Sequence, residues 1–147
     1  MQPVKQIAPE EINLRAAGLL FIRCLLGLIF LMQGYGKVFT IGVGHIYDMF
    51  FKPFETTFLP KWLITATAYY SSYAELICGA FLLIGLFRKY VLYLLALDLL
   101  LVSFGHGLME PIWDLSHVIP RAILLALLFF LPQQWDKWNA DSLFNKK

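Results

Sequence analysis

Hydrophobic residues gather in four long runs along the chain, separated by short stretches that carry charge, proline or glycine. The runs cover residues 16–37, 62–87, 90–107 and 117–131. The hydrocarbon core of a bilayer is roughly 30 Å thick, so a helix needs about 20 residues to cross it. The fourth run is the shortest and ends at Pro132, which cannot continue a helix. The pattern predicts an all-α, four-transmembrane-helix bundle that forms one domain over residues 1–147.

The connections between these runs predict which helices are neighbours. The second and third runs are joined by the turn at Arg88 and Lys89, and residues 108–116 join the third and fourth. Such short connections favour antiparallel neighbours. Only residues 38–61 make a long connection, which is rich in aromatic residues yet interrupted by prolines. We expect an amphipathic segment there that caps the bundle and lies in the membrane–water interface on the outer side. The alternative is a loop packed on the helix ends.

The composition excludes several classes of protein. Hydrophobic residues make up 59% of the chain and charged residues only 15%, which is far from the composition of a soluble or disordered protein. The net charge of +2 includes no dense basic block, so we expect no nucleic-acid partner. Cys24 and Cys78 stand alone in apolar runs, which argues against a disulfide framework or a zinc ribbon. We expect both to be free thiols.

Basic residues predict the orientation in the membrane. With four crossings, both termini lie on one side of the bilayer. That side carries Lys5, Arg15, Arg88, Lys89, Lys137, Lys146 and Lys147, and the opposite side carries Lys37, Lys52 and Lys61. By the positive-inside rule, both termini lie in the cytoplasm. The tail from Gln133, with Trp135 and Trp138, is expected to anchor at the cytoplasmic interface.

Four charged residues lie deep inside the predicted spans, one in each: Arg23, Glu75, Asp98 and Arg121. A charge at such a depth costs a few kcal/mol, so these residues should face inward and be paired or functional. The depth of each residue below the cytoplasmic end of its helix can be counted at about 1.5 Å per residue. Similar depths predict that Arg23 pairs with Asp98 and that Glu75 pairs with Arg121. The pairs could fix the helix register, or they could line a polar cavity that handles a head group or a proton.

Polar residues near the outer ends of the spans extend this set. They are Gln33, Lys37, His106, Glu110, Asp114 and His117. Gly27 and Gly34 share a helix face with Arg23 and Lys37, and Gly79 shares one with Glu75. These glycines allow close helix packing or leave room for a flat ligand, and close packing is the commoner use. The two histidines match no metal motif, so no metal or haem is expected.

Two segments resemble the DoxX family of membrane proteins. Residues 22–37, which run from Arg23 through a Leu-Gly-hydrophobic-Phe stretch to Gly34 and Lys37, are similar to its first helix. Residues 75–88, which begin at Glu75 and end in Gly-Leu-Phe-Arg, are similar to its second-helix signature, and His106 also fits the family. Gln33 stands where the family often has His, and the tail after Pro132 departs from the common glycine-rich ending.

The resemblance implies a four-helix protein of the cytoplasmic membrane that acts as the small subunit of a quinone-linked oxidoreductase. It is more distantly similar to the small subunit of thiosulfate:quinone oxidoreductase. The expected binding residues for a quinone or similar lipophilic head group are Arg23, Gln33, Lys37, Glu75, Asp98, His106 and Arg121. No catalytic residue is assigned. The chain shows no flavin fold or cluster motif, so electrons would come from a partner subunit.

A second hypothesis is a non-enzymatic membrane scaffold or carrier in which the charge pairs are structural. In both hypotheses the expected partners are membrane lipid and either a partner subunit or further copies of the same chain.

Overall fold

The computed structural model describes residues 9–110, 112, 114 and 116–144. Three of the basic residues used to predict the orientation, Lys5, Lys146 and Lys147, lie outside the described residues. So do three positions in the connection at residues 108–116.

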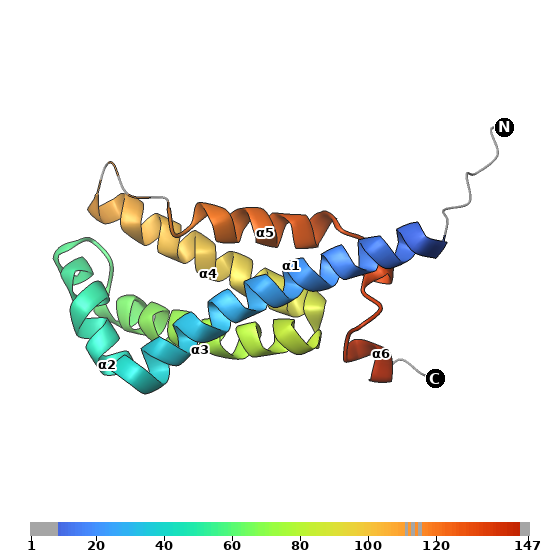
Figure 1. Cartoon of the computed structure of the whole chain (residues 1–147). Helices are drawn as coiled ribbons and strands as arrows, with labels where there is room; N and C mark the ends of the chain where they lie inside the picture. The colour runs from blue at the N-terminus through green and yellow to red at the C-terminus, as the bar shows by residue number, and fades with distance from the viewer. Residues whose placement is uncertain (1–8, 111, 113, 115, 145–147) are drawn as a thin grey trace.

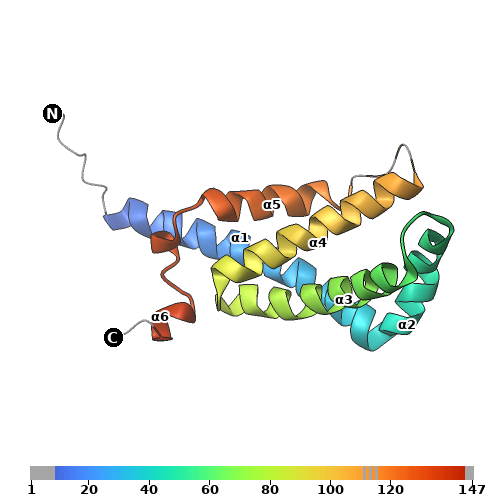
Figure 2. The same ribbon diagram turned by 180° about the vertical axis from the view of Figure 1, so that it is seen from behind.

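The described chain is helical and contains no strand, as the sequence predicts. Four helices lie side by side: α1 (Pro9–Tyr35), α3 (Lys61–Ile84), α4 (Arg88–Met109) and α5 (Ile119–Phe130), as Figure 1 shows. Helix α1 packs most extensively on α3, α3 also packs on α4, and α5 contacts both α1 and α4. The first and last described residues lie at the same end of the bundle in both views (Figures 1 and 2).

Short helical turns connect α1 to α3 at the opposite end. They are η1 (Gly36–Ile41), α2 (Val43–Ile46), η2 (Tyr47–Phe51) and η3 (Lys52–Thr56). Val43 and Ile46 are buried, and α2 and η2 contact α3, so this segment packs on the helix ends. Packing on the helix ends is common to both predictions, and a place in the membrane interface stays a prediction. Phe50 and Phe58 nevertheless remain exposed, so the segment also presents an apolar outer face.

Glu55 ties this outer segment to the start of α3. Its carboxylate accepts a hydrogen bond from the Tyr47 hydroxyl and pairs with Lys61 Nζ at 3.3 Å. The Tyr47 hydrogen bond, and then Lys61, hold the pKa of Glu55 below its usual value. A lowered pKa means that the contribution to stability is present above the usual carboxyl range and is lost as pH falls through the folded value. We therefore expect the protection of amides in residues 47–61, measured against their intrinsic exchange rates, to fall on acidification, and we expect Glu55→Gln to remove that dependence.

Two described helical stretches are long and apolar enough to cross a membrane, Glu10–Ile41 and Arg88–Met109. The first continues α1 into the π-helical turn η1. Helix α3 is also long, but its polar residues and Glu75 make it less apolar, and α5 is apolar but shorter. The helix ends agree with the predicted spans to within a few residues, except that α1 begins seven residues earlier.

The surface of the helices exposes many large hydrophobic side chains, and several charged side chains are buried, unlike in a typical soluble protein. Large apolar side chains point outward from the helices, for example Phe21 (66% exposed), Leu100 (69%) and Phe130 (85%). In contrast, Arg23 and Glu75 are each only 1% exposed. Exposed apolar surface on this scale is typical of a surface that lipid or another protein covers. The inward direction predicted for the charges is confirmed.

The interior between the charged residues is an apolar core to which all four long helices contribute. Its fully buried members include Leu26 and Phe30 of α1, Leu82 of α3 and Leu95 of α4. Cys78 belongs to this core, Cys24 is half-buried, and both are free thiols, as expected.

Glycines bring α1 and α3 into close contact. A Cβ atom at Gly27 would lie 2.9 Å from the backbone nitrogen of Leu83, and one at Gly79 would overlap the backbone of Leu31. A Cβ atom at Gly34 would overlap the backbone of Leu76. These glycines therefore serve close helix packing, and they leave no room for a flat ligand at these points.

Candidate functional site

Five polar side chains form a cluster between α1, α3, α4 and α5, which we call the Glu75 cluster: Gln33, Lys37, Glu75, Asp98 and Arg121. Lys37 Nζ lies 2.6 Å from Glu75 Oε2, and Arg121 Nη1 lies 3.7 Å from Glu75 Oε1. Each oxygen of the Glu75 carboxylate therefore has its own cation. Arg121 Nη1 also donates a hydrogen bond to Gln33 Oε1 at 2.6 Å, which links α5 to α1.

Local structure explains how these groups meet. Gly34 lets α1 approach the backbone of α3 at Glu75 and Leu76, and Lys37 lies one turn further along, in η1. There its ammonium group reaches Glu75 and donates a hydrogen bond to Ser71 Oγ at 3.3 Å. Arg121 lies in the first turn of α5, directly after Pro120, which suits a helix start.

The Glu75 cluster is almost closed, with one edge at the surface. The side chain of Glu75 is 1% exposed and that of Arg121 is 9% exposed, whereas that of Lys37 is 25% exposed. Gln33 is also only partly buried. A ligand would therefore meet Lys37 and Gln33 first and Glu75 behind them.

Asp98 differs from the other members of the cluster. It is fully buried, and neither of its carboxyl oxygens has a hydrogen-bond partner among the described residues. Glu75, Lys37 and Arg121 interact with it electrostatically, but none of the ion pairs in the described structure includes it. Asp98 is therefore near the charged pairs without belonging to one.

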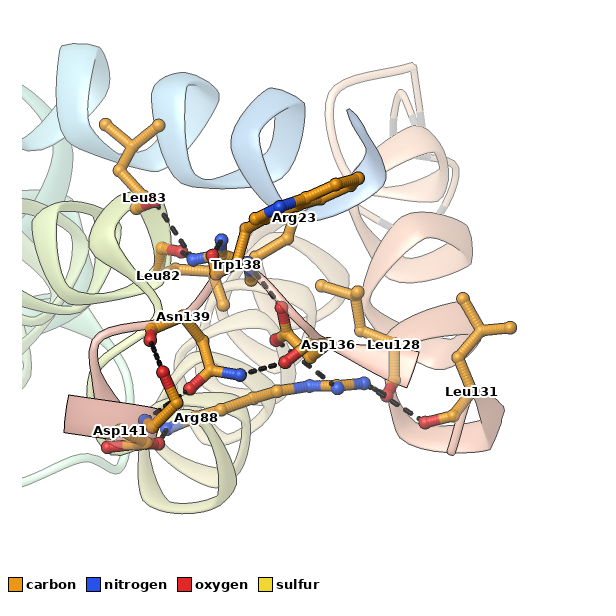
Figure 3. A network of polar contacts seen from close by, with 11 residues as sticks. Arg23, Leu82, Leu83, Arg88, Leu128, Leu131, Asp136, Trp138, Asn139 and Asp141 are labelled. Carbon is orange, nitrogen blue, oxygen red and sulfur yellow. Dashed lines mark hydrogen bonds and ion pairs between the residues drawn. The ribbon is translucent and has the colours of Figure 1, made fainter. Parts of the chain in front are cut away.

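A second polar network lies near the chain termini, and we call it the Asp136 cluster: Arg23, Arg88 and Asp136 (Figure 3). Arg23 Nε lies 3.5 Å from Asp136 Oδ1, and Arg88 Nη1 lies 3.6 Å from Asp136 Oδ2. All three side chains are at most 5% exposed. Two buried arginines thus share one buried carboxylate.

Main-chain carbonyl groups satisfy much of the remaining hydrogen-bonding capacity of these arginines. Arg23 donates to the carbonyl oxygens of Leu82 at 2.8 Å, Leu83 at 3.0 Å and Trp138 at 2.6 Å. Arg88 donates to those of Leu128 at 2.6 Å and Leu131 at 3.1 Å. The last carbonyl groups of a helix have no intrahelical partner, and these hydrogen bonds satisfy such groups at the C-terminal ends of α3 and α5. The Asp136 cluster therefore holds helix ends together.

The tail after α5 completes this clamp. It passes through η4 (Gln133–Trp135) to α6 (Asp141–Phe144). Asp141 Oδ1 accepts a hydrogen bond from the backbone N–H of Phe87 at 2.9 Å, beside the first residue of α4. The amide of Ala140 donates to the carbonyl of Ile84 at 3.0 Å. The tail is thus part of the packed structure at this end.

Pairing by depth is right for one pair and wrong for the other. Glu75 does pair with Arg121, although Lys37 is closer to it. Arg23 pairs with Asp136 and not with Asp98, and its assignment as a binding residue stays a prediction. The depth estimate considered only residues inside the spans, and Asp136 lies beyond them. The sequence does allow this pair, because Arg23 lies close enough to the cytoplasmic end of its predicted span for its long side chain to reach the helix ends.

His106 lies apart from the Glu75 cluster. It is eight residues after Asp98 on α4, a rise of about 12 Å, and its side chain is exposed. Asp114, further out, accepts hydrogen bonds from Ser116, and Glu110 and His117 are exposed. Among the described residues, no group of three or more His, Cys, Asp or Glu side chains is placed to hold a metal ion.

A hollow of about 280 Å³ lies between the first turns of α4 and the end of α5. Its lining includes Arg88, Lys89, Tyr93 and Gln133. It is therefore at the end of the bundle that holds the Asp136 cluster, and no member of the Glu75 cluster lines it. A polar cavity that opens at the Glu75 cluster, as the sequence suggests, remains a prediction.

Comparison with known proteins agrees with the two motifs in the sequence. The family model named DoxX matches residues 18–107. That range includes both resembling segments and four of the five residues of the Glu75 cluster, all except Arg121. No curated protein and no solved structure gives a significant match. The match covers more than half of the chain and agrees with the apolar helices and the outward-facing hydrophobic surface of a membrane protein, so the chain belongs to the DoxX family.

Proposed function

We propose that this DoxX chain crosses the cytoplasmic membrane four times, with both termini in the cytoplasm. Two described stretches have the length and hydropathy of spans, and α3 and α5 lie alongside them. Glu75 and Arg121, which lower the apolar character of these two helices, point into the bundle and are hidden from lipid. Because the described ends share one end of the bundle, an even number of crossings fits the fold.

We further propose that the Glu75 cluster binds the head group of a quinone or a similar lipophilic molecule. Quinone carbonyl oxygens need hydrogen-bond donors, and the surface edge of the cluster offers the Lys37 ammonium group and the Gln33 amide. Glu75 holds Lys37 from behind and keeps its charge aimed at that edge. The bound quinone would then be the electron carrier. The observation that carries the proposal is the partly exposed Lys37 paired with a fully buried Glu75.

Electrons would reach this site from a partner subunit. Cys24 and Cys78 lie on different helices and are the only cysteines of the chain, so they do not provide the ligands of an iron–sulfur cluster. The chain would then be the small, quinone-binding subunit of a membrane oxidoreductase, with the redox centre on a protein that assembles with it.

Lipid extraction tests the proposal. The protein is purified in detergent, and its bound lipids are extracted and identified by mass spectrometry. We expect quinone in the wild type and its loss in Glu75→Gln, because the neutral amide no longer holds Lys37. The matched control is Glu55→Gln, which changes a glutamate outside the cluster and should retain quinone. Equal amounts of quinone in all three proteins, or none in any, would contradict head-group binding.

The Asp136 cluster supports a second candidate function, a non-enzymatic membrane scaffold. In this cluster buried charge serves helix packing alone. If the Glu75 cluster does the same, the purified protein would hold no quinone, a partner protein would co-purify equally with the wild type and Glu75→Gln, and the variant would differ only in stability.

A further inference from the structure

Asp98 is an ionisable group of the Glu75 cluster that the head-group proposal does not use. It lies in the middle of α4 and is 0% exposed. Both of its carboxyl oxygens are buried and without a hydrogen-bond partner in the described part of the chain. A buried polar group in that position needs an explanation.

An ionised Asp98 would be costly at this site. A buried carboxylate requires cations or hydrogen-bond donors, and the nearby cations are already engaged by Glu75, one at each oxygen. Glu75 itself adds a second negative charge to the surroundings of Asp98. Two neighbouring carboxyl groups repel each other when both are ionised, so one of them tends to keep its proton. In this pair the cations lie against Glu75, and neither of them forms an ion pair with Asp98.

Other groups facing Asp98 do not change this assignment. They come from two helices and from η1: Tyr70, Ser71, Glu75 and Cys78 on α3, Lys37 on η1 and Arg121 on α5. The Tyr70 hydroxyl donates to the carbonyl oxygen of Leu94 at 2.8 Å and is therefore engaged elsewhere. The Ser71 hydroxyl also interacts with Asp98, and it accepts a hydrogen bond from Lys37 Nζ at 3.3 Å.

We propose that Asp98 is a proton-binding site, which carries a proton in the resting protein and exchanges it with the outer surface through Glu75 and Lys37. On release, the O–H bond of Asp98 breaks and a new one forms on the Glu75 carboxylate. Lys37, which is 25% exposed, passes a proton to water and takes the one held by Glu75. No electron moves in this exchange. The proposal stands on the burial and geometry of Asp98 and does not require a bound head group.

Infrared spectroscopy tests the proposal on the full chain in lipid nanodiscs. Aspartate labelled with ¹³C in its carboxyl group separates the absorption of protonated aspartic acid from that of glutamic acid. At neutral pH we expect a protonated aspartic acid band in the wild type that disappears in Asp98→Asn. Asp114→Asn is the matched control, because Asp114 is exposed and accepts hydrogen bonds from Ser116, which lower its pKa.

Two further variants keep the test decisive. In Asp98→Glu the band should move from labelled aspartate to unlabelled glutamate, which identifies the group even if Asp98→Asn does not fold. In Lys37→Met the exchange of this proton for deuterium should slow at least tenfold. Absence of the band from the wild type, or its persistence in Asp98→Asn, would overturn the proposal. Unchanged exchange in Lys37→Met would overturn the route through Lys37.

Discussion

Replacing Asp136 with alanine is expected to lower the free energy of unfolding by about 3–5 kcal/mol, because it leaves Arg23 and Arg88 buried without an anion. The carbonyl groups that accept hydrogen bonds from these arginines cannot neutralise their charge. The loss should be seen as a lower midpoint in thermal or denaturant unfolding of the detergent-purified protein. It should also release the tail, because Arg23 binds the Trp138 carbonyl group only when its guanidinium stays in place.

The exposed ion pair between Asp48 and Lys52 offers a matched control for this prediction. Its atoms are 3.5 Å apart, but both side chains are more than 60% exposed. Such pairs contribute little because water screens them. Asp48→Ala should therefore leave the unfolding midpoint unchanged. If Asp136→Ala behaved like Asp48→Ala, the Asp136 cluster would not be the clamp that holds the helix ends.

Substituting alanine for Gly34 is expected to destabilise the bundle by about 1–3 kcal/mol, because the added methyl group overlaps the backbone of α3 at Leu76. Backbone atoms cannot rotate away as the end of a side chain can, so α1 and α3 must separate. The separation occurs one turn from Lys37 and would lengthen its contact with Glu75. We therefore expect a lower unfolding midpoint together with weaker retention of quinone.

Gly18→Ala is the control on the same helix. Nothing lies within 4 Å of a Cβ atom at Gly18, so alanine there meets no neighbour. Alanine also favours the helix over glycine by up to about 1 kcal/mol. Gly18→Ala should be neutral or stabilising. A Gly34→Ala protein as stable as the wild type would mean that the two helices do not pack as closely as described.

Much of the fold follows from sequence patterns that act locally. The hydrophobic runs give helices whose ends lie within a few residues of the prediction, except at the start of α1. The helical period places Arg23, Gly27, Gly34 and Lys37 on one face, and this face does turn toward the interior. Periodicity is reliable here because an ionisable side chain that faced lipid would be costly at every position along the helix.

The partners of the buried charges are harder to predict from the sequence. Depth alone suggested that Arg23 meets Asp98, yet Asp136 folds back from the tail and takes that role. Lys37, expected at the outer surface, bends toward Glu75 and becomes its nearest cation. Arginine and lysine side chains are long, so residues at different depths can pair and residues at equal depth need not.

By itself, the sequence determined that this chain is an all-helical membrane protein of the DoxX family with inward-facing charges, since hydropathy, helical period and two short motifs are properties of local sequence. Only the tertiary structure decided that these charges separate into a structural clamp at Asp136 and a cluster at Glu75 with one surface edge. It also left Asp98 without a partner. The reason is that pairing depends on the reach of flexible side chains and on the path of the tail, which no local pattern records.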